Sequence, residues 1–244
     1  MAHLKAILLT LIRRLCNELG LELIGREKMP RKSLLGLRYY DFKTIIDVGA
    51  NEGQFASMAS KMFPQSRLYC FEPLPAAFKS LAAWVESRPE GNVKLFNMAL
   101  GDKDGMVEMY YHTEHSPSSS LLPTTSNTEM IYPVTKHQKS ISVPLKTLDH
   151  ALLEYSDEIT EDLLIKMDVQ GYENRVIRGG RKIFGRAKAV ILEVCLDSLY
   201  EKQAKFSDIV QMMDEYGFRY KGNLEQVYGD DGRVIFLDAV FDRG

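Results

Sequence analysis

Two glycines and a glutamate are spaced as a nucleoside-binding site requires. Gly49 and Gly53 lie in segment 47–53, which reads DVGANEG. An apolar run that begins at residue 44 leads into this segment. Glu72 closes a second apolar run nineteen residues after Gly53. Glycines let the chain turn tightly and let a ligand approach the backbone. A carboxylate at the end of the next strand suits the two hydroxyls of a ribose. The pattern therefore predicts a nucleoside-binding site.

Asn51 distinguishes between classes of nucleoside cofactor. The dinucleotide fingerprint GxGxxG needs its second glycine so that the pyrophosphate can approach, and Asn51 occupies that position here. The sequence also has no GxxxxGK[ST] loop of the kind that holds nucleotide phosphates. An adenosine with a free diol and no phosphates fits best, which points to S-adenosylmethionine. An NAD-dependent oxidoreductase is the alternative that Asn51 counts against.

Two later carboxylates are the candidates for catalysis. Asp168 closes the apolar run 163–168, and Glu193 lies near the end of the run 189–194. Either side chain could take a proton from a hydroxyl, and together they could hold Mg²⁺, which prefers oxygen ligands. The alternative roles for Asp168 are a helix N-cap and a ligand to the amine of the cofactor. Lys166 points to the same face as Asp168, so we expect a structural ion pair between them.

These residues lie in a chain of apolar runs that alternate with amphipathic segments. We expect strands at 44–49, 67–72, 93–100, 163–168 and 189–194, with helices between them, and two more at 219–228 and 234–241 around the turn 229–232. Alternating strands and helices predict an α/β fold with a parallel sheet covered on both faces. The GDDG turn predicts a C-terminal antiparallel hairpin. In such sheets ligands bind beyond the carboxyl ends of the strands.

Residues 106–148 interrupt this alternation. We expect strands at 107–111 and 141–145 around a loop from His112 to Lys139 that is rich in Ser, Thr and Pro. Loops of this length are usually functional or disordered. We therefore predict that this loop covers the acceptor.

Four motifs in order resemble the FkbM-type S-adenosylmethionine-dependent methyltransferases. They are IIDVGANEG (45–53), FEP (71–73), NMALG (97–101) and KMDVQGYE (166–173), within a resemblance over residues 40–240. The resemblance implies the Rossmann-like class I methyltransferase fold, with seven strands in the order 3-2-1-4-5-7-6. It also implies methylation of a hydroxyl on a sugar, glycan or small-molecule natural product. N-methylation or methylation of a protein is the alternative on the same fold.

The resemblance also implies roles for single residues in the cofactor site. It places Asp47, Gly49, Asn51 and Gly53 along the methionine side of the cofactor, Glu72 on the ribose and Asn97 to Ala99 near the adenine. Ser119 and Ser120 match a Ser-rich stretch that approaches the cofactor pocket. For these two serines, a flexible surface loop is the alternative interpretation.

Composition excludes several other classes of protein. The chain has 244 residues, 45% of them hydrophobic and 26% charged, which is typical of a globular protein. A net charge of −2 argues against a general nucleic-acid-binding protein. Three scattered cysteines indicate a reducing compartment and form no zinc-site spacing. Because no apolar stretch is long enough to span a bilayer, we expect a cytoplasmic protein.

The first 40 residues differ in charge from the domain that we expect at 41–244. Residues 1–46 hold nine Lys or Arg against four Asp or Glu, a net charge of +5, so the remainder carries −7. Apolar residues recur at helical spacing at Leu4, Ile7, Leu8, Leu11, Leu15 and Leu19. This amphipathic helix has two interpretations: a helix on a membrane surface, or a helix packed on its own domain or on a second subunit. Basic residues alone are weak evidence for a membrane, which favours the second.

Overall fold

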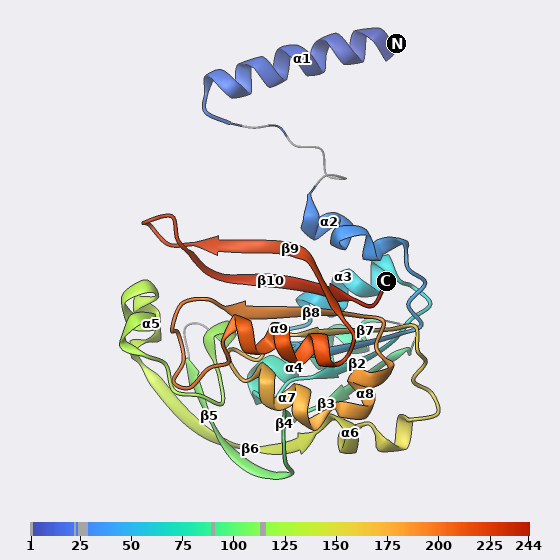
Figure 1. Cartoon of the computed structure of the whole chain (residues 1–244), viewed down its shortest axis with the longest axis vertical. Helices are drawn as coiled ribbons and strands as arrows, with labels where there is room; N and C mark the ends of the chain where they lie inside the picture. The colour runs from blue at the N-terminus through green and yellow to red at the C-terminus, as the bar shows by residue number, and fades with distance from the viewer. Residues whose placement is uncertain (1, 22, 24–28, 89–90, 113–115) are drawn as a thin grey trace.

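A seven-stranded sheet forms the centre of the molecule. The computed structural model describes residues 2–21, 23, 29–88, 91–112 and 116–244 (Figure 1). The sheet runs in the order β3-β2-β1-β7-β8-β10-β9. Its strands are β1 (Thr44–Val48), β2 (Arg67–Phe71), β3 (Val93–Phe96), β7 (Leu163–Met167), β8 (Ala189–Cys195), β9 (Arg219–Tyr228) and β10 (Val234–Asp242). Strand β10 is antiparallel to both of its neighbours. This order confirms the predicted class I methyltransferase fold and the C-terminal hairpin.

Helices cover both faces of this sheet, as the alternating pattern predicts (Figure 1). They are α3 (Gln54–Met62), α4 (Pro75–Glu86), α6 (Leu148–Ala151), α7 (Glu173–Gly179), α8 (Arg181–Arg186) and α9 (Phe206–Glu215), with the 3₁₀ turn η5 (Leu153–Tyr155) after α6. Ile46 and Val48 belong to one hydrophobic cluster and Ile45 to another, so β1 is buried on both sides. Burial on both faces explains why the central strands are mostly apolar rather than alternating in the sequence.

The predicted strand at 93–100 is wrong, because it is two strands in two different sheets. Strand β3 ends at Phe96, and β4 (Ala99–Gly101) joins a second sheet of order β4-β6-β5 with β6 (Gln138–Thr147) and β5 (Gly105–His112). The side-chain amide of Asn97 donates to the carbonyls of Glu72 at 2.8 Å and Pro73 at 3.2 Å. These bonds tie the chain to the end of β2 at the break between the two strands. The strands expected at 107–111 and 141–145 lie within β5 and β6 and pair antiparallel.

The segment between β5 and β6 contains short helices rather than a plain loop. It holds η3 (Ser116–Ser118), α5 (Ser126–Ile131) and η4 (Pro133–Lys136). The Thr125 side chain caps α5 by accepting from the backbone N–H of Thr128, and the Thr125 hydroxyl donates to the carbonyl of Ser198 at 2.6 Å. Residues 113–115 of the expected loop lie outside the described residues.

The N-terminal segment begins with helix α1 (Ala2–Glu18), close to the bounds that the leucine spacing predicts. Further on, α2 (Pro30–Ser33) and the 3₁₀ turn η2 (Leu34–Tyr39) bury Leu34 and Leu37 against the core beside β1. The domain division at residue 40 stays a prediction. Among the described helices, none combines the length and the apolar character that crossing a membrane needs.

Candidate functional site

A cavity opens at the carboxyl ends of β1, β2 and β7, beside the point where the strand order reverses. Its empty volume is about 630 Å³. Its walls come from the turn after β1, the end of β2, strands β4 and β5, the segment 116–121 and the turn after β7. Sheets of this kind bind ligands at this place. Of the predicted site residues, Gly49, Asn51, Glu72, Ala99, Ser119, Ser120 and Asp168 line the cavity.

The turn after β1 requires its glycines for steric reasons. Gly49 has φ +75°, and a Cβ there would lie 1.9 Å from the backbone oxygen of Asp168. Asn51 adopts φ +47°, a conformation that Asn tolerates better than most residues. Gly53, with φ +92°, is the residue immediately before α3 and does not line the cavity. Gly49 therefore lets the backbone after β1 approach the backbone after β7 at the cavity wall.

Glu72 closes this turn from the side of β2. Its carboxylate is only 5% exposed and accepts the backbone N–H groups of Asn51 and Leu74, both at 2.8 Å. Burial raises the pKa of Glu72 to about 7, although the two N–H donors lower it. The Asn51 side-chain oxygen is buried beside it and has no hydrogen-bond partner among the described residues. Both groups can accept hydrogen bonds from a bound diol or amine, so this wall fits a nucleoside without phosphates.

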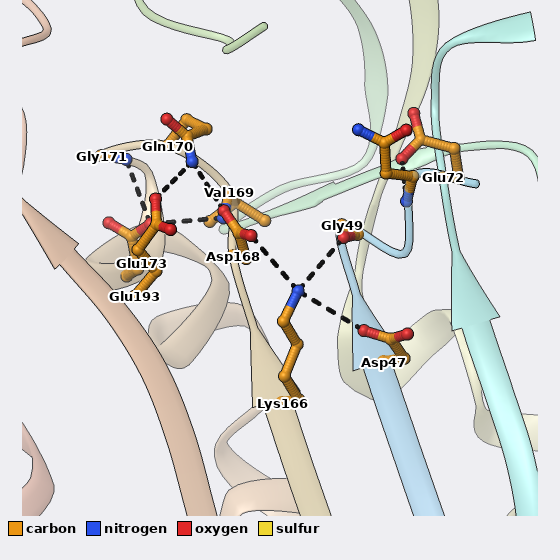
Figure 2. A network of polar contacts seen from close by, with 11 residues as sticks. Asp47, Gly49, Glu72, Lys166, Asp168, Val169, Gln170, Gly171, Glu173 and Glu193 are labelled. Carbon is orange, nitrogen blue, oxygen red and sulfur yellow. Dashed lines mark hydrogen bonds and ion pairs between the residues drawn. The ribbon is translucent and has the colours of Figure 1, made fainter. Parts of the chain in front are cut away.

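Lys166 connects β1 and β7 below the cavity (Figure 2). Its Nζ lies 3.4 Å from the Asp168 carboxylate, 3.4 Å from the carbonyl of Gly49 and 3.7 Å from the Asp47 carboxylate. The expected ion pair between Lys166 and Asp168 is therefore present. Burial lowers the pKa of Lys166, but the carboxylates of Asp168 and Asp47 raise it more, so the ammonium stays charged. Asp47 itself is fully buried and does not line the cavity.

Gln170 joins the two candidate catalytic carboxylates, and sequence reasoning missed it. Its side-chain amide donates to Asp168 at 2.7 Å and to Glu193 (Figure 2). The Tyr200 hydroxyl donates to the side-chain oxygen of Gln170 at 2.5 Å. The backbone oxygen of Gln170 accepts a hydrogen bond from the Ser120 hydroxyl at 2.7 Å. Gln170 has φ +55°, which is uncommon for a residue other than glycine. The QG pair at 170–171, two residues after the strand-end Asp168, was the signal that could have found it.

Glu193 does not line the cavity and reaches it through Gln170. It lies opposite Asp238 in the pairing of β8 with β10. Burial raises the pKa of Glu193 well above its usual range, and the carboxylates of Asp168 and Asp238 add to this effect. Of the two predicted catalytic carboxylates, Asp168 is therefore the one that faces the cavity.

Glu173 holds the turn between β7 and α7. Its Oε1 accepts the backbone N–H groups of Gly171 at 3.0 Å and Val169 at 3.3 Å. Gly171 has φ +94°, a left-handed conformation that glycine adopts at little cost. Burial raises the pKa of Glu173 to about 7. Its carboxylate fixes the backbone on either side of Gln170.

The other predicted residues are distributed between the wall and its support. Ser119 and Ser120 are buried, and the backbone of Ser120 pairs with Tyr110 of β5, so these serines do not form an exposed loop. Asn97 supports the end of β2 and does not line the cavity. Within the described residues, no group of three or more His, Cys, Asp or Glu side chains is arranged to hold a metal ion. The predicted magnesium therefore has no support.

Comparison with known proteins supports the predicted methyltransferase. The family model of the methyltransferase FkbM domain matches residues 47–220. The 2-O-methyltransferase NoeI of Sinorhizobium fredii is 27% identical over 177 residues, covering 70% of this chain and 71% of that protein. Methyltransferase 1 of Beauveria bassiana is 24% identical over 210 residues, covering 82% of each chain. A solved SAM-dependent methyltransferase from Aquifex aeolicus is 13% identical, with a TM-score of 0.44 over 89% of this chain and 92% of that chain.

Proposed function

Because the chain belongs to the FkbM methyltransferase family and is an S-adenosylmethionine-dependent methyltransferase, we propose that it methylates a hydroxyl of a sugar, glycan or small-molecule natural product. One observation carries the choice of a hydroxyl. Asp168 presents a carboxylate to the cavity, and Lys166 and Gln170 hold that carboxylate in place. A hydroxyl acceptor must lose its proton as the methyl group arrives, so it needs a base within hydrogen-bond reach. The name of the NoeI relative supports the same chemistry.

The proposed mechanism assigns one task to each wall of the cavity. S-adenosylmethionine supplies an electrophilic methyl group on a sulfonium. Glu72 and Asn51 hold the ribose and polar groups of the cofactor on the β1–β2 side. Asp168 orients the acceptor hydroxyl and accepts its proton while the O–CH₃ bond forms and the S–CH₃ bond breaks. Lys166 pairs with the Asp168 carboxylate at 3.4 Å and so fixes its position at the cavity wall.

The test is a search for methylated product by mass spectrometry over a panel of glycans and small hydroxylated metabolites. In Asp168→Asn the shape of the side chain is kept and its basicity is lost. We expect turnover to fall by about 10²–10⁴-fold, with the affinity for S-adenosylmethionine nearly unchanged. Asp162→Asn is the matched control, because Asp162 directly precedes β7 and pairs with Lys188 at the opposite end of the strand.

Three results would contradict parts of this proposal. An unchanged rate in Asp168→Asn would leave Asp168 a structural role only. A loss of cofactor affinity would make Asp168 a cofactor ligand. Methylated amines or methylated protein as the sole products would favour the N- or protein-directed alternative, because a free amine needs less help from a base.

A further inference from the structure

Helix α1 carries an apolar face that its own chain leaves exposed. Leu8, Leu11 and Leu15 of α1, and Leu19 directly after its last residue, follow one another at spacings of three and four residues, so they lie along one side. Their exposed fractions are 57%, 59%, 59% and 68%. Scattered surface leucines are ordinary, but a row of this length on one helix marks an interaction surface.

Basic side chains accompany this apolar row. Arg13 and Arg14 are exposed on α1, and Arg14 forms an ion pair with Glu18 at 3.7 Å in which both side chains are largely exposed. Such an exposed pair is weak and leaves the arginine available to another anion. Together with residues up to 46, the segment has a net charge of +5, whereas the rest of the chain carries −7. Helix α1 itself holds Lys5, Arg13 and Arg14 against Glu18, a net charge of +2.

Apolar and basic side chains also occur together in the segment after α1, near the point where the chain enters the core. Arg38 and Tyr39 follow the buried Leu37, and the Tyr39 side chain is 80% exposed. The Arg38 guanidinium lies 5.2 Å from the centre of the Tyr39 ring. Tyr side chains with an apolar ring and a polar tip are enriched at membrane–water interfaces. On α2, Lys32 adds an exposed basic residue, whereas Arg31 pairs with Glu225 of β9.

We propose that α1 binds an anionic membrane surface and lies in the plane of the interface. The leucine row enters the boundary between headgroups and acyl chains, and the arginines contact lipid phosphates and carboxylates. A lipid surface offers acyl chains to the leucines and anionic headgroups to the arginines at the same place, whereas pairing of α1 with the α1 of a second copy would bring like charges together. This proposal does not depend on the identity of the methyl acceptor.

Cosedimentation of the full chain with lipid vesicles tests the proposal. Vesicles of phosphatidylcholine with about a third phosphatidylserine should bind at least about tenfold more protein than phosphatidylcholine alone, and added salt should reduce the difference. The double variant Leu11→Glu/Leu15→Glu should lose at least about tenfold in binding. Arg13→Gln/Arg14→Gln should lose about 5- to 25-fold. Asn17→Ala, a change on the polar side of α1, is the matched control and should bind as the unmodified chain does.

Folding and catalysis serve as references for these variants. Because the substituted side chains are exposed on α1 and contribute nothing to the cavity, the thermal unfolding and S-adenosylmethionine affinity of every variant should be unchanged. Equal binding to both kinds of vesicle, or to neither, would overturn the proposal. A dimer in light scattering that the Leu11→Glu/Leu15→Glu variant abolishes, without vesicle binding by the unmodified chain, would assign the leucine row to a second copy.

Discussion

Glu72 has a carboxylate whose charge state changes near neutral pH. Its pKa is raised to about 7 by burial, and a ribose diol donates to the ionised form. Below pH 7 cofactor binding must therefore release a proton. We expect the affinity for S-adenosylmethionine to rise by up to about tenfold per pH unit up to pH 7 and then to level off. Calorimetry from pH 5.5 to 8.5 measures this, and a flat profile would contradict it.

The same carboxylate gives a mutational test. Glu72→Ala should weaken S-adenosylmethionine binding by about 1–3 kcal/mol, because two hydroxyls lose a charged acceptor. The pH dependence of S-adenosylmethionine binding should disappear when the Glu72 carboxylate is removed. Glu86→Ala, an exposed change at the end of α4, is the control and should alter neither quantity. Unchanged affinity in Glu72→Ala would remove Glu72 from the cofactor site.

Gln170 is a positioning residue for Asp168. Its amide separates two carboxylates and holds both of them, so its loss leaves Asp168 and Glu193 facing each other without a donor between them. We expect Gln170→Leu to lower kcat by about 10- to 100-fold while the KM for S-adenosylmethionine changes little. The acid limb of the pH–rate profile should move to higher pH, because the repulsion raises the pKa of the pair. Gln170→Glu adds a third carboxylate and should be worse than Gln170→Leu. An unmoved pH profile in both variants would reduce Gln170 to packing.

At the scale of elements, Gly49 sets how closely β1 and β7 approach. A Cβ at Gly49 would overlap the backbone oxygen of Asp168, and φ +75° disfavours any side chain there. We expect Gly49→Ala to lower the free energy of unfolding by about 3 kcal/mol or more and to abolish cofactor binding. Gly185→Ala is the control: Gly185 lies in α8 with open space around it, so the change should be neutral or stabilising by up to about 1 kcal/mol. Urea unfolding of both variants tests the comparison.

The segment carrying α5 and η4 is the element most able to cover an acceptor. Its start is already fixed, since Ser120 pairs with Tyr110, whereas Met130 on α5 is 74% exposed. We expect amide exchange to slow in residues 126–136 when cofactor and acceptor bind together, with little change at Ser120. The β9–β10 turn at 229–232 is an internal reference that should not respond. Equal exchange over 126–136 in the free and bound protein would contradict a covering role.

The sequence allowed the strands of the main sheet to be predicted better than the connections around the cavity. Strands β1 and β7 are buried on both faces, so each is a largely apolar run, interrupted only by Asp47 in β1 and Lys166 in β7 after the initial Thr44, and each is followed by a turn-forming or polar residue. The break at Asn97 depends on hydrogen bonds to the end of β2, which lies 25 residues earlier, and no local pattern reveals it. Helix α5 is only six residues long and too short for a helical period. Gln170 was missed because its role depends on Glu193, from a strand that only the fold brings near.

Across the whole molecule, acidic side chains with raised pKa values gather at the carboxyl edge of the sheet. Burial raises the pKa of Asp47, of Glu72 and Glu173 to about 7, of Glu193 well above its usual range, and of Asp238 to about 6. One buried cation, Lys166, lies among them, and its pKa is also raised. A cluster of this kind costs stability that the core must supply elsewhere, as is common where a site is built for binding.

This edge determines how the stability of the unliganded protein depends on pH. Between the ordinary value of 4.5 and the raised value of about 7, Glu72 and Glu173 are protonated in the folded chain and ionised in the unfolded chain. The folded state therefore binds more protons over this window, and the free energy of unfolding falls as pH rises through it. We expect the unliganded protein to be less stable at pH 8 than at pH 5.5, as measured by urea unfolding.

Glu173→Gln separates this effect from other pH-dependent contributions. The two N–H groups that Glu173 accepts both reach the same oxygen, Oε1, so an amide can keep them while it removes the charge. We expect the variant to recover up to about 3 kcal/mol of the stability lost between pH 4.5 and 8, since each pKa unit corresponds to about 1.4 kcal/mol. Saturating S-adenosylmethionine should stabilise the unmodified protein more at pH 8 than at pH 5.5, because Glu72 binds the diol in its ionised form. A free energy of unfolding that rises with pH over this window in the unliganded protein would mean that these carboxylates are ionised at no cost, and the electrostatic account of the site would fail with it.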